Sequence, residues 1–335
     1  MFEGKKVLIT GGTGSLGRAL TKRLLKYDIK TLRIFSRNEN MQVDMQSEFD
    51  DPRLRFLIGD VRDEMRLSRA LEDIDIVFHA AALKHVPLIE YNPTESIMTN
   101  VIGSHNVVIE SIKNHVEKVV GIGTDKAVSP LNTYGATKLL MEKLFVNAIK
   151  QFNAEKYRTR FLCVRYGNVL ASSGSVVPLF IKQIKTGQKI TITDPDMTRL
   201  SITMDEAVDF ILSSTEMSVG CEVFVPKLRA YNIMDLKDVL VELLGKSDHE
   251  IIKIRPGEKL HELLINKYEI PYTKDMGDRY VILYPQIFGE PEVVSSKIMK
   301  KYGDLPNADL KEEYSSETVP LLSKKELKDM LVHYI

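Results

Sequence analysis

The chain has few cysteines, no tryptophan and no excess of either charge. Only Cys163 and Cys221 occur among its 335 residues, which permits one disulfide but excludes a disulfide scaffold or a cysteine-based zinc site. Lysine plus arginine and aspartate plus glutamate each number 46, so the formal net charge is zero. That balance excludes a nucleic-acid binder held by bulk charge, although a local basic patch would still fit. We expect no nucleic-acid partner.

Long apolar runs are also absent. No stretch approaches the roughly 18 apolar residues that a membrane-spanning helix needs. Near the N-terminus, the acidic Glu3 and the short apolar run at 7–10 argue against a signal peptide. Hydrophobic residues still make up 44% of the chain and charged residues 27%, an ordinary globular balance with ample material for a core. The sequence predicts a cytoplasmic globular protein that does not bind membranes.

Short apolar runs alternate with amphipathic segments over the first 170 residues. Leucines at 16, 20 and 24 recur at the helical period, and we expect further helices at about 95–114 and 132–152, the latter with Ala136, Leu140, Leu144 and Ala148 on one face. Strand–helix alternation predicts an α/β fold with a doubly wound parallel Rossmann-type sheet, whose ligands bind beyond the carboxyl ends of the strands. The expected strands are 7–10, 32–35, 54–58, 74–78, 118–122 and 160–164.

The alternation stops near residue 170, where prolines and glycines separate shorter elements. We expect residues 1–169 to form the Rossmann domain and residues 170–335 to form mainly a smaller substrate-binding domain. The apolar run 222–225 predicts one strand near 221–226 that returns to the main sheet.

The segment between the first strand and the first helix is rich in glycine. Gly11, Gly14 and Gly17 are spaced G-x-x-G-x-x-G, and glycine permits a tight turn and a close approach of backbone to a pyrophosphate. A preceding strand and a following helix are the context in which such a loop binds a dinucleotide; the alternative is a turn without a ligand. The predicted phosphate loop comprises Gly11, Gly12, Thr13, Gly14, Ser15, Leu16 and Gly17.

Residues after the second strand indicate which dinucleotide binds. An acidic residue there would bind the ribose 2′-hydroxyl of NAD, but the chain has Arg37, which can pair with the 2′-phosphate of NADP. The alternative is an ordinary surface arginine. We expect NADP to lie against Ser36, Arg37, Asn38, Asp60, Val61, Ala80, Ala81 and Ala82, the alanines being small enough to admit it.

Two histidines near the fourth strand, His79 and His85, are of a metal-ligand type. No carboxylate or cysteine completes a set with them, so we expect no metal site.

Tyr134 and Lys138 are spaced i, i+4 at the start of a helix, so both project from one face. A nearby ammonium favours phenolate, and a phenolate can take the proton of a substrate hydroxyl while hydride leaves its carbon. Thr124, Asp125 and Lys126 end the fifth strand at the same edge, adding a hydrogen-bonding group, an acid and a base. The alternatives are an exposed helix pair and a charged loop.

Several segments carry a family resemblance in the same order along residues 1–265. The chain resembles the extended short-chain dehydrogenase/reductases, and more narrowly the inverting UDP-N-acetylglucosamine 4,6-dehydratases of pseudaminic acid and capsule sugar pathways. The Asp125-Lys126 pair is the most specific feature, because retaining dehydratases usually have Asp-Glu there and 4-epimerases usually lack the pair. The matching segments are 11–17, 79–87, 124–127, 132–138, 165–169, 197–199 and 255–259.

The resemblance implies a role for each matching residue. Thr124, Asp125, Lys126, Tyr134 and Lys138 would be catalytic, and Tyr134, Lys138 and Val169 would also contact NADP. Arg199 and Arg255 suit a diphosphate, since each guanidinium offers a fork of donors; the alternative is structural salt bridges. The implied UDP-sugar site comprises Lys84, Thr124, Asn168, Val176, Thr193, Arg199, Arg255 and Glu258.

The implied reaction begins with oxidation at C4, with Tyr134 as base and NADP, tightly bound and recycled, accepting the hydride. Lys126 then removes the C5 proton, Asp125 protonates the departing C6 hydroxyl, hydride returns to C6 and C5 is reprotonated with inversion. Lys126 must be neutral to act as base, so we expect burial or cations such as Lys138 to lower its pKa. The resemblance also implies a homo-oligomer, a hexamer or a dimer.

Three other functions fit parts of this pattern. A UDP-hexose 4-epimerase would use Tyr134 and Lys138 but leave Asp125 and Lys126 idle. A retaining 4,6-dehydratase would differ in the configuration at C5. A non-catalytic NADP-sensing protein on the same fold would need neither pair.

Overall fold

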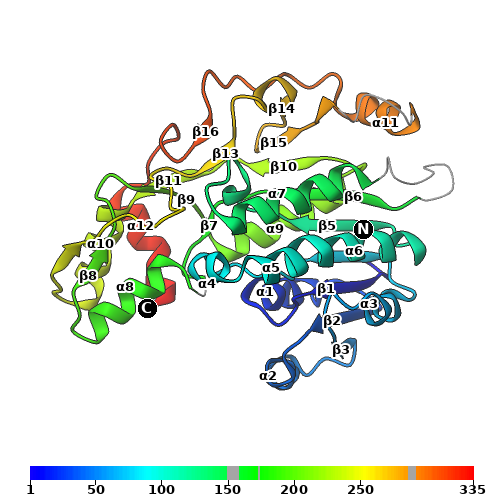
Figure 1. The fold of residues 1–335 in the computed structure, drawn as a ribbon, viewed down its shortest axis with the longest axis horizontal. Coiled ribbons are helices and arrows are strands. Elements are labelled where there is room, and N and C mark those ends of the chain that lie inside the picture. Colours follow the sequence, from blue (N-terminus) through cyan, green and yellow to red (C-terminus); the bar gives the residue numbers. More distant parts are fainter. Residues whose placement is uncertain (149–157, 173, 286–291) are drawn as a thin grey trace.

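A nine-stranded sheet forms the centre of the protein in the computed structural model, which describes residues 1–148, 158–172, 174–285 and 292–335 (Figure 1). From β3 to β10 neighbouring strands are parallel, whereas β15 pairs antiparallel with both β10 and β14. The order across the sheet is β14 (Thr273–Asp275), β15 (Arg279–Ile282), β10 (Val223–Pro226), β6 (Arg160–Val164), β5 (Lys118–Ile122), β4 (Ile76–His79), β1 (Lys6–Thr10), β2 (Thr31–Ser36) and β3 (Leu54–Ile58).

Helices cover both faces of this sheet, which confirms the predicted doubly wound fold. On one face α1 (Ser15–Leu24) packs against α9 (Met204–Met217); on the other, α6 (Gly103–Lys113) lies between α3 (Glu64–Leu71) and α7 (Thr133–Val146). Every residue of β4 and β5 is buried, which explains the unbroken apolar runs at 76–78 and 119–122. The returning strand expected near 221–226 is β10, parallel to β6.

The helix predicted at 95–114 is interrupted by a π turn. It comprises α5 (Pro93–Ser96), the π-helical η1 (Ile97–Ile102) and α6, and it follows α4 (Val86–Tyr91). Within η1, the Asn100 side chain bonds both backbone groups of Leu83, at 2.8 and 2.9 Å. The π turn therefore fixes the loop after β4, which borders the site described below.

Helix α7 begins with Asn132, whose Oδ1 accepts from the N–H of Gly135 at 2.8 Å. Only the end of the apolar stripe predicted for this segment is buried: Ala148 is fully buried and Leu144 partly. Ala136 is exposed and Leu140 is 50% exposed, whereas Lys138, Met141 and Phe145 are buried. The apolar pattern does not predict the whole buried face because α7 also buries polar and charged side chains, such as Lys138. Residues 149–152 of the predicted helix lie outside the described residues.

A smaller part has a second hydrophobic core, between residues 170 and 331. Its sheets are β7 (Asn168–Val169) with β9 (Thr198–Ile202) and β11 (Arg229–Asn232), and β8 (Ile190–Ile192) with β12 (His249–Ile251). Helices α8 (Val176–Lys185), α10 (Ile233–Leu244) and α12 (Lys324–Leu331) complete it at the left of Figure 1. The remaining elements are α2 (Glu39–Phe49), η2 (Asp125–Ala127), β13 (Leu263–Ile265), η4 (Ile270–Tyr272), α11 (Glu292–Tyr302), β16 (Tyr314–Ser315) and η6 (Val332–Tyr334).

Segments after residue 263 return to the larger core, where Leu264, Tyr280 and Tyr302 pack. Arg165 is fully buried and links these segments to α7. Its guanidinium bonds Glu142 of α7 at 2.6 Å and Glu269, which follows β13, at 2.7 Å. We propose that the chain divides into two domains between residues 169 and 170. The first domain then also includes residues 221–226 and much of 263–315, which pack in its core. Within the described residues, no helix is long and apolar enough to span a membrane.

Candidate active site

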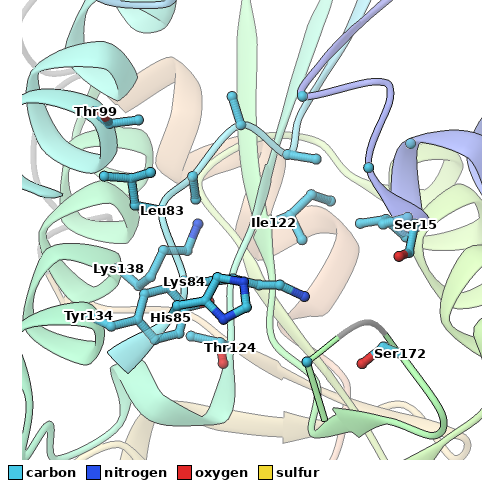
Figure 2. A pocket seen from close by; sticks show the side chains of 18 of the residues that line it. Ser15, Leu83, Lys84, His85, Thr99, Ile122, Thr124, Tyr134, Lys138 and Ser172 are labelled. Carbon is cyan, nitrogen blue, oxygen red and sulfur yellow. The ribbon is translucent and has the colours of Figure 1, made fainter. Parts of the chain in front are cut away.

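A cavity of about 1040 Å³ opens at the carboxyl ends of the parallel strands. In Figure 2, Tyr134, Lys138, Thr124 and Lys84 lie toward one side of it and Ser15 toward the other. Five predicted catalytic residues line it together: Thr124, Asp125, Lys126, Tyr134 and Lys138. The predicted cofactor residues line it as well, except Gly12, which packs behind the loop against Ile9 and Ile34.

The phosphate loop is shaped for a close approach of backbone. Gly11 has φ +66°, and a Cβ there would lie 2.8 Å from the Cα of Ala81, so no side chain fits. Gly14 precedes α1 without a side-chain cap, so the first N–H groups of this ten-residue helix are left to bind something else. Free N–H groups and the helix dipole suit a diphosphate, and the cavity therefore fits a dinucleotide.

The far end of the cavity contains the residues expected to choose the cofactor. Arg37 is 52% exposed and its Nη1 lies 3.8 Å from Asp60, whose carboxylate is bonded by Arg62 at 2.7 Å. Burial raises the pKa of Asp60, but the bonds from Arg62 outweigh it and the pKa is lowered. Because Arg62 neutralises Asp60, the guanidinium of Arg37 stays available to an anion. Asn38 caps α2 through the N–H of Met41.

His79 is buried in a hydrogen-bonding network. Its ring nitrogens contact Thr10 Oγ1 at 2.8 Å and Ser104 Oγ at 2.9 Å, and burial lowers its pKa to about 3. The neutral ring thus links β1 to α6. The described residues contain no group of three or more potential metal-ligating side chains, and His79 has a structural environment instead.

Asp125 and Lys126 form an ion pair in the cavity wall. Lys126 Nζ lies 3.1 Å from Asp125 Oδ1, which also accepts from Thr124 Oγ1 at 2.8 Å. The second oxygen, Oδ2, is buried and has no hydrogen-bond partner among the described residues; Asp125 as a whole is only 1% exposed. A buried carboxylate oxygen without a donor is costly, so this atom is suited to a substrate hydroxyl.

The pKa expected for Lys126 is wrong in direction. Burial lowers the pKa of this amine, but the carboxylates of Asp125 and Glu262 outweigh burial and raise it above its ordinary value. The cation that opposes them is Arg199, and not Lys138. Glu262 lies 136 positions away from Lys126 in the sequence, so no local pattern predicts its effect on this pKa.

Tyr134 also departs from the expectation. Burial raises the pKa of its hydroxyl, and the cation that lowers it is Lys126; a contact with Thr124 lowers it as well. Lys138 Nζ lies 3.0 Å from Met141 Sδ, and burial lowers its pKa to about 8. In the structure the expected depression of the tyrosine pKa by Lys138 is therefore wrong, because burial is the stronger influence.

The predicted sugar-nucleotide residues fall into two groups. Lys84, Thr124 and Asn168 line the cavity with the catalytic residues. Arg199 lies just behind Lys126 and bonds Glu258 at 3.4 Å and the carbonyl oxygen of Leu260 at 3.0 Å. Five of the predicted residues do not line the cavity, and among them Arg199 forms ion pairs with Glu258 and Glu262, so the diphosphate role of the arginines stays a prediction; the five are Val176, Thr193, Arg199, Arg255 and Glu258.

Some residues that line the cavity are not among the predicted site residues. Thr99 belongs to the π turn and Tyr166 follows β6, while Ser172, Gly174 and Ser175 form the loop after β7. The serine- and glycine-rich composition of that loop was the one local signal for it. Glu262, buried behind Lys126, had no local signal.

The comparisons now identify the family. The model of the polysaccharide biosynthesis protein family matches residues 7–284. The chain belongs to this family. It is 44% identical over 345 residues to an inverting UDP-N-acetylglucosamine 4,6-dehydratase of Campylobacter jejuni, covering 99% of both chains. This match confirms the resemblance inferred from the motifs.

Other relatives widen the range of activities. The chain is 41% identical to a UDP-glucose 4-epimerase of Rickettsia canadensis, covering 99% of this chain and 96% of that one. Among solved structures, Pen from Bacillus thuringiensis superimposes with a TM-score of 0.90 at 37% identity, covering 99% and 98% of the two chains. Overall identity therefore does not separate dehydratase from epimerase, and the site residues must do so.

Proposed function

We propose that the protein is an inverting UDP-N-acetylglucosamine 4,6-dehydratase that forms a UDP-2-acetamido-2,6-dideoxy-4-hexulose. The observation that supports this most directly is the Asp125–Lys126 ion pair facing the same cavity as Tyr134. An epimerase exchanges hydride at one carbon and needs no second acid and base. Loss of water across C5 and C6 needs both, next to each other.

Tyr134 is the proposed base at the C4 hydroxyl, with Thr124 beside it. When NADP is bound against the phosphate loop, it would supply the hydride chemistry, which is acceptance of hydride from C4 and return of that hydride to C6. Lys126 is the cation that lowers the pKa of Tyr134. It favours the phenolate and offsets part of the rise in pKa that burial causes. Lys84 lines the same cavity and is the residue that we propose binds the sugar nucleotide.

Asp125 and Lys126 need one proton moved before they can act. In the structure Lys126 is an ammonium beside two carboxylates, but elimination needs an amine at C5 and a carboxylic acid at the C6 hydroxyl. Transfer of one proton from Nζ to Asp125, across 3.1 Å, breaks an N–H bond, forms an O–H bond and yields both forms at once. The new O–H bond is on Oδ1, which is therefore the atom proposed to protonate the departing C6 hydroxyl, while the unpartnered Oδ2 is left to accept a hydrogen bond.

The product separates this function from its rivals. Incubation with UDP-N-acetylglucosamine, followed by NMR, should show a 4-keto-6-deoxy sugar with inverted C5. Retained configuration would indicate a retaining dehydratase, whereas a C4 epimer that keeps its C6 hydroxyl would indicate an epimerase. No turnover of this or related UDP-sugars would leave a non-catalytic protein.

We propose NADP over NAD because Arg37 is 52% exposed at the cofactor end of the cavity, and Asp60, its partner at 3.8 Å, is already paired with Arg62 at 2.7 Å. Arg37→Ala should weaken NADP binding roughly tenfold or more, as expected for a charge-assisted pair, and leave NAD binding nearly unchanged. Isothermal titration with both cofactors measures this, with exposed Arg55→Ala as the matched control. Equal losses for both cofactors would show that Arg37 does not recognise the 2′-phosphate.

We also propose a homo-oligomer, a dimer or a hexamer. Exposed apolar side chains gather on α4, η1 and α7, which pack against one another: Tyr91 is 88% exposed, Ile97 45% and Leu140 50%. Such a patch marks an interaction surface. Light scattering at micromolar concentration should show an oligomer that Leu140→Glu dissociates and Val43→Glu, exposed on α2, does not. A monomeric unmodified protein would contradict this proposal.

A further inference from the structure

Glu262 is a buried carboxylate that the proposed reaction does not use. It is 3% exposed and does not line the cavity. Its Oε1 lies 3.8 Å from Lys126 Nζ and 3.9 Å from Arg199 Nε, and its Oε2 has no hydrogen-bond partner among the described residues. Burying a second carboxylate beside an ammonium that Asp125 already pairs is costly, so its retention calls for a role.

The fold holds this carboxylate in place. Glu262 directly precedes β13, and its N–H donates to Ser316 Oγ at 2.9 Å while its carbonyl oxygen accepts from the N–H of Ser316 at 2.8 Å. Ser316 Oγ in turn lies 2.7 Å from Thr198 Oγ1, next to Arg199 on β9. The C-terminal segment thus clamps Glu262 against the strand that carries Arg199.

Glu262 and Asp125 approach the same ammonium from different elements. Asp125 belongs to η2 and faces the cavity, whereas Glu262 belongs to the segment before β13 and lies behind it. The charged and titratable groups acting on this pair come from six elements or loops: Lys84, Asp125, Tyr134, Arg199, Tyr231, Lys259 and, through Arg199, Glu258. Arg199 opposes Glu262, so the two together tune the charge at Lys126.

We propose that Glu262 is a positioning residue that holds the Lys126 ammonium from behind and sets the pH at which Lys126 becomes a free amine. The proposal rests on the proposed function, in which that amine is the base at C5. Glu262 touches neither substrate nor cavity, and it acts only through Lys126. Its negative charge favours the ammonium, so its removal shifts the appearance of the amine to lower pH.

The first test measures directly how the protonation of the Lys126 amine depends on pH, and it needs no turnover of substrate. The protein is treated with acetic anhydride over a range of pH, and the acetylation rate of Lys126, which is 26% exposed, is followed by peptide mass spectrometry. In Glu262→Gln the midpoint should fall by about one pH unit relative to the unmodified chain. Glu258→Gln, which acts on Lys126 only through Arg199, should move the midpoint far less. An unchanged midpoint in Glu262→Gln overturns the proposal.

The second test compares rates. The proposed reaction keeps one proton on the Asp125–Lys126 pair, so activity is lost at the pH where Lys126 gives that proton to solvent. This basic limb of the pH–kcat profile with UDP-N-acetylglucosamine should move down in Glu262→Gln by the same amount, with KM changed by less than about twofold. Glu262→Asp, which keeps the charge, should stay closer to the unmodified profile. If thermal melting shows the glutamine variant unfolded, Glu262→Met, which also removes the charge, takes its place in both tests. A shifted acetylation midpoint with an unshifted kcat profile would refute Lys126 as the base, and so the proposed function, while leaving the charge effect of Glu262 standing.

Discussion

Lys126→Ala is expected to lower the rate of water elimination by about 100-fold or more, the usual contribution of a positioned acid or base. Once C4 is a ketone, the C5 proton is acidic but still needs a base, and Lys126 Nζ is the amine that the structure places beside Asp125 in the cavity. Elimination should fail while the earlier step survives at a reduced rate, because Tyr134 is intact but loses the cation that favours its phenolate. The near-ultraviolet absorbance of reduced nicotinamide should therefore still appear on adding substrate.

Deuterium gives an independent check of the same step. In D2O the unmodified protein should place deuterium at C5, since the ammonium of Lys126 exchanges with solvent, whereas the hydrogen gained at C6 should come from C4. Lys126→Ala should yield no C5-deuterated product. The matched control is Lys143→Ala, on α7 outside this cavity, which should behave like the unmodified protein. Near-normal elimination by Lys126→Ala would remove this residue from the mechanism.

Much of the larger domain could be predicted because its strands are buried on both faces. Runs such as 119–122 are apolar throughout, the pattern typical of a covered parallel strand. Helix α2 was missed because it buries only Gln42 and Met45 and has no apolar stripe; its one signal was Asn38 at the N-cap. Strands β14 and β15 were missed since each is short and their pairing depends on distant partners.

The site divides in the same way. Motifs local in sequence, such as Gly11–Gly17 and Asp125–Lys126, lead directly to the cavity wall, because each follows a parallel strand. The charge state of Lys126 could not be predicted, since it depends on Glu262 and Arg199 from other elements. The buried polar face of α7 was hidden for a related reason: Lys138 is buried by the fold and looks like a surface residue in the sequence.

Tyr134→Phe should block the reaction before elimination. The phenylalanine keeps the ring and removes only the hydroxyl, which is the proposed acceptor of the C4 hydroxyl proton. Without it, neither reduced nicotinamide nor C5 deuterium should appear, and turnover should fall by about 100-fold or more. This pattern differs from that of Lys126→Ala, in which the nicotinamide signal persists, so the two variants order the steps.

The control for this change is Tyr166→Phe, which removes another hydroxyl from a buried tyrosine of the same cavity. Its turnover should fall far less, because no proton transfer is assigned to it. Burial raises the pKa of Tyr134, so in the unmodified protein the rate of the first step should rise with pH as phenolate forms. Stopped-flow measurement of nicotinamide reduction would follow that rise. A Tyr134→Phe protein that still reduced its cofactor at the normal rate would show that another group removes the C4 hydroxyl proton.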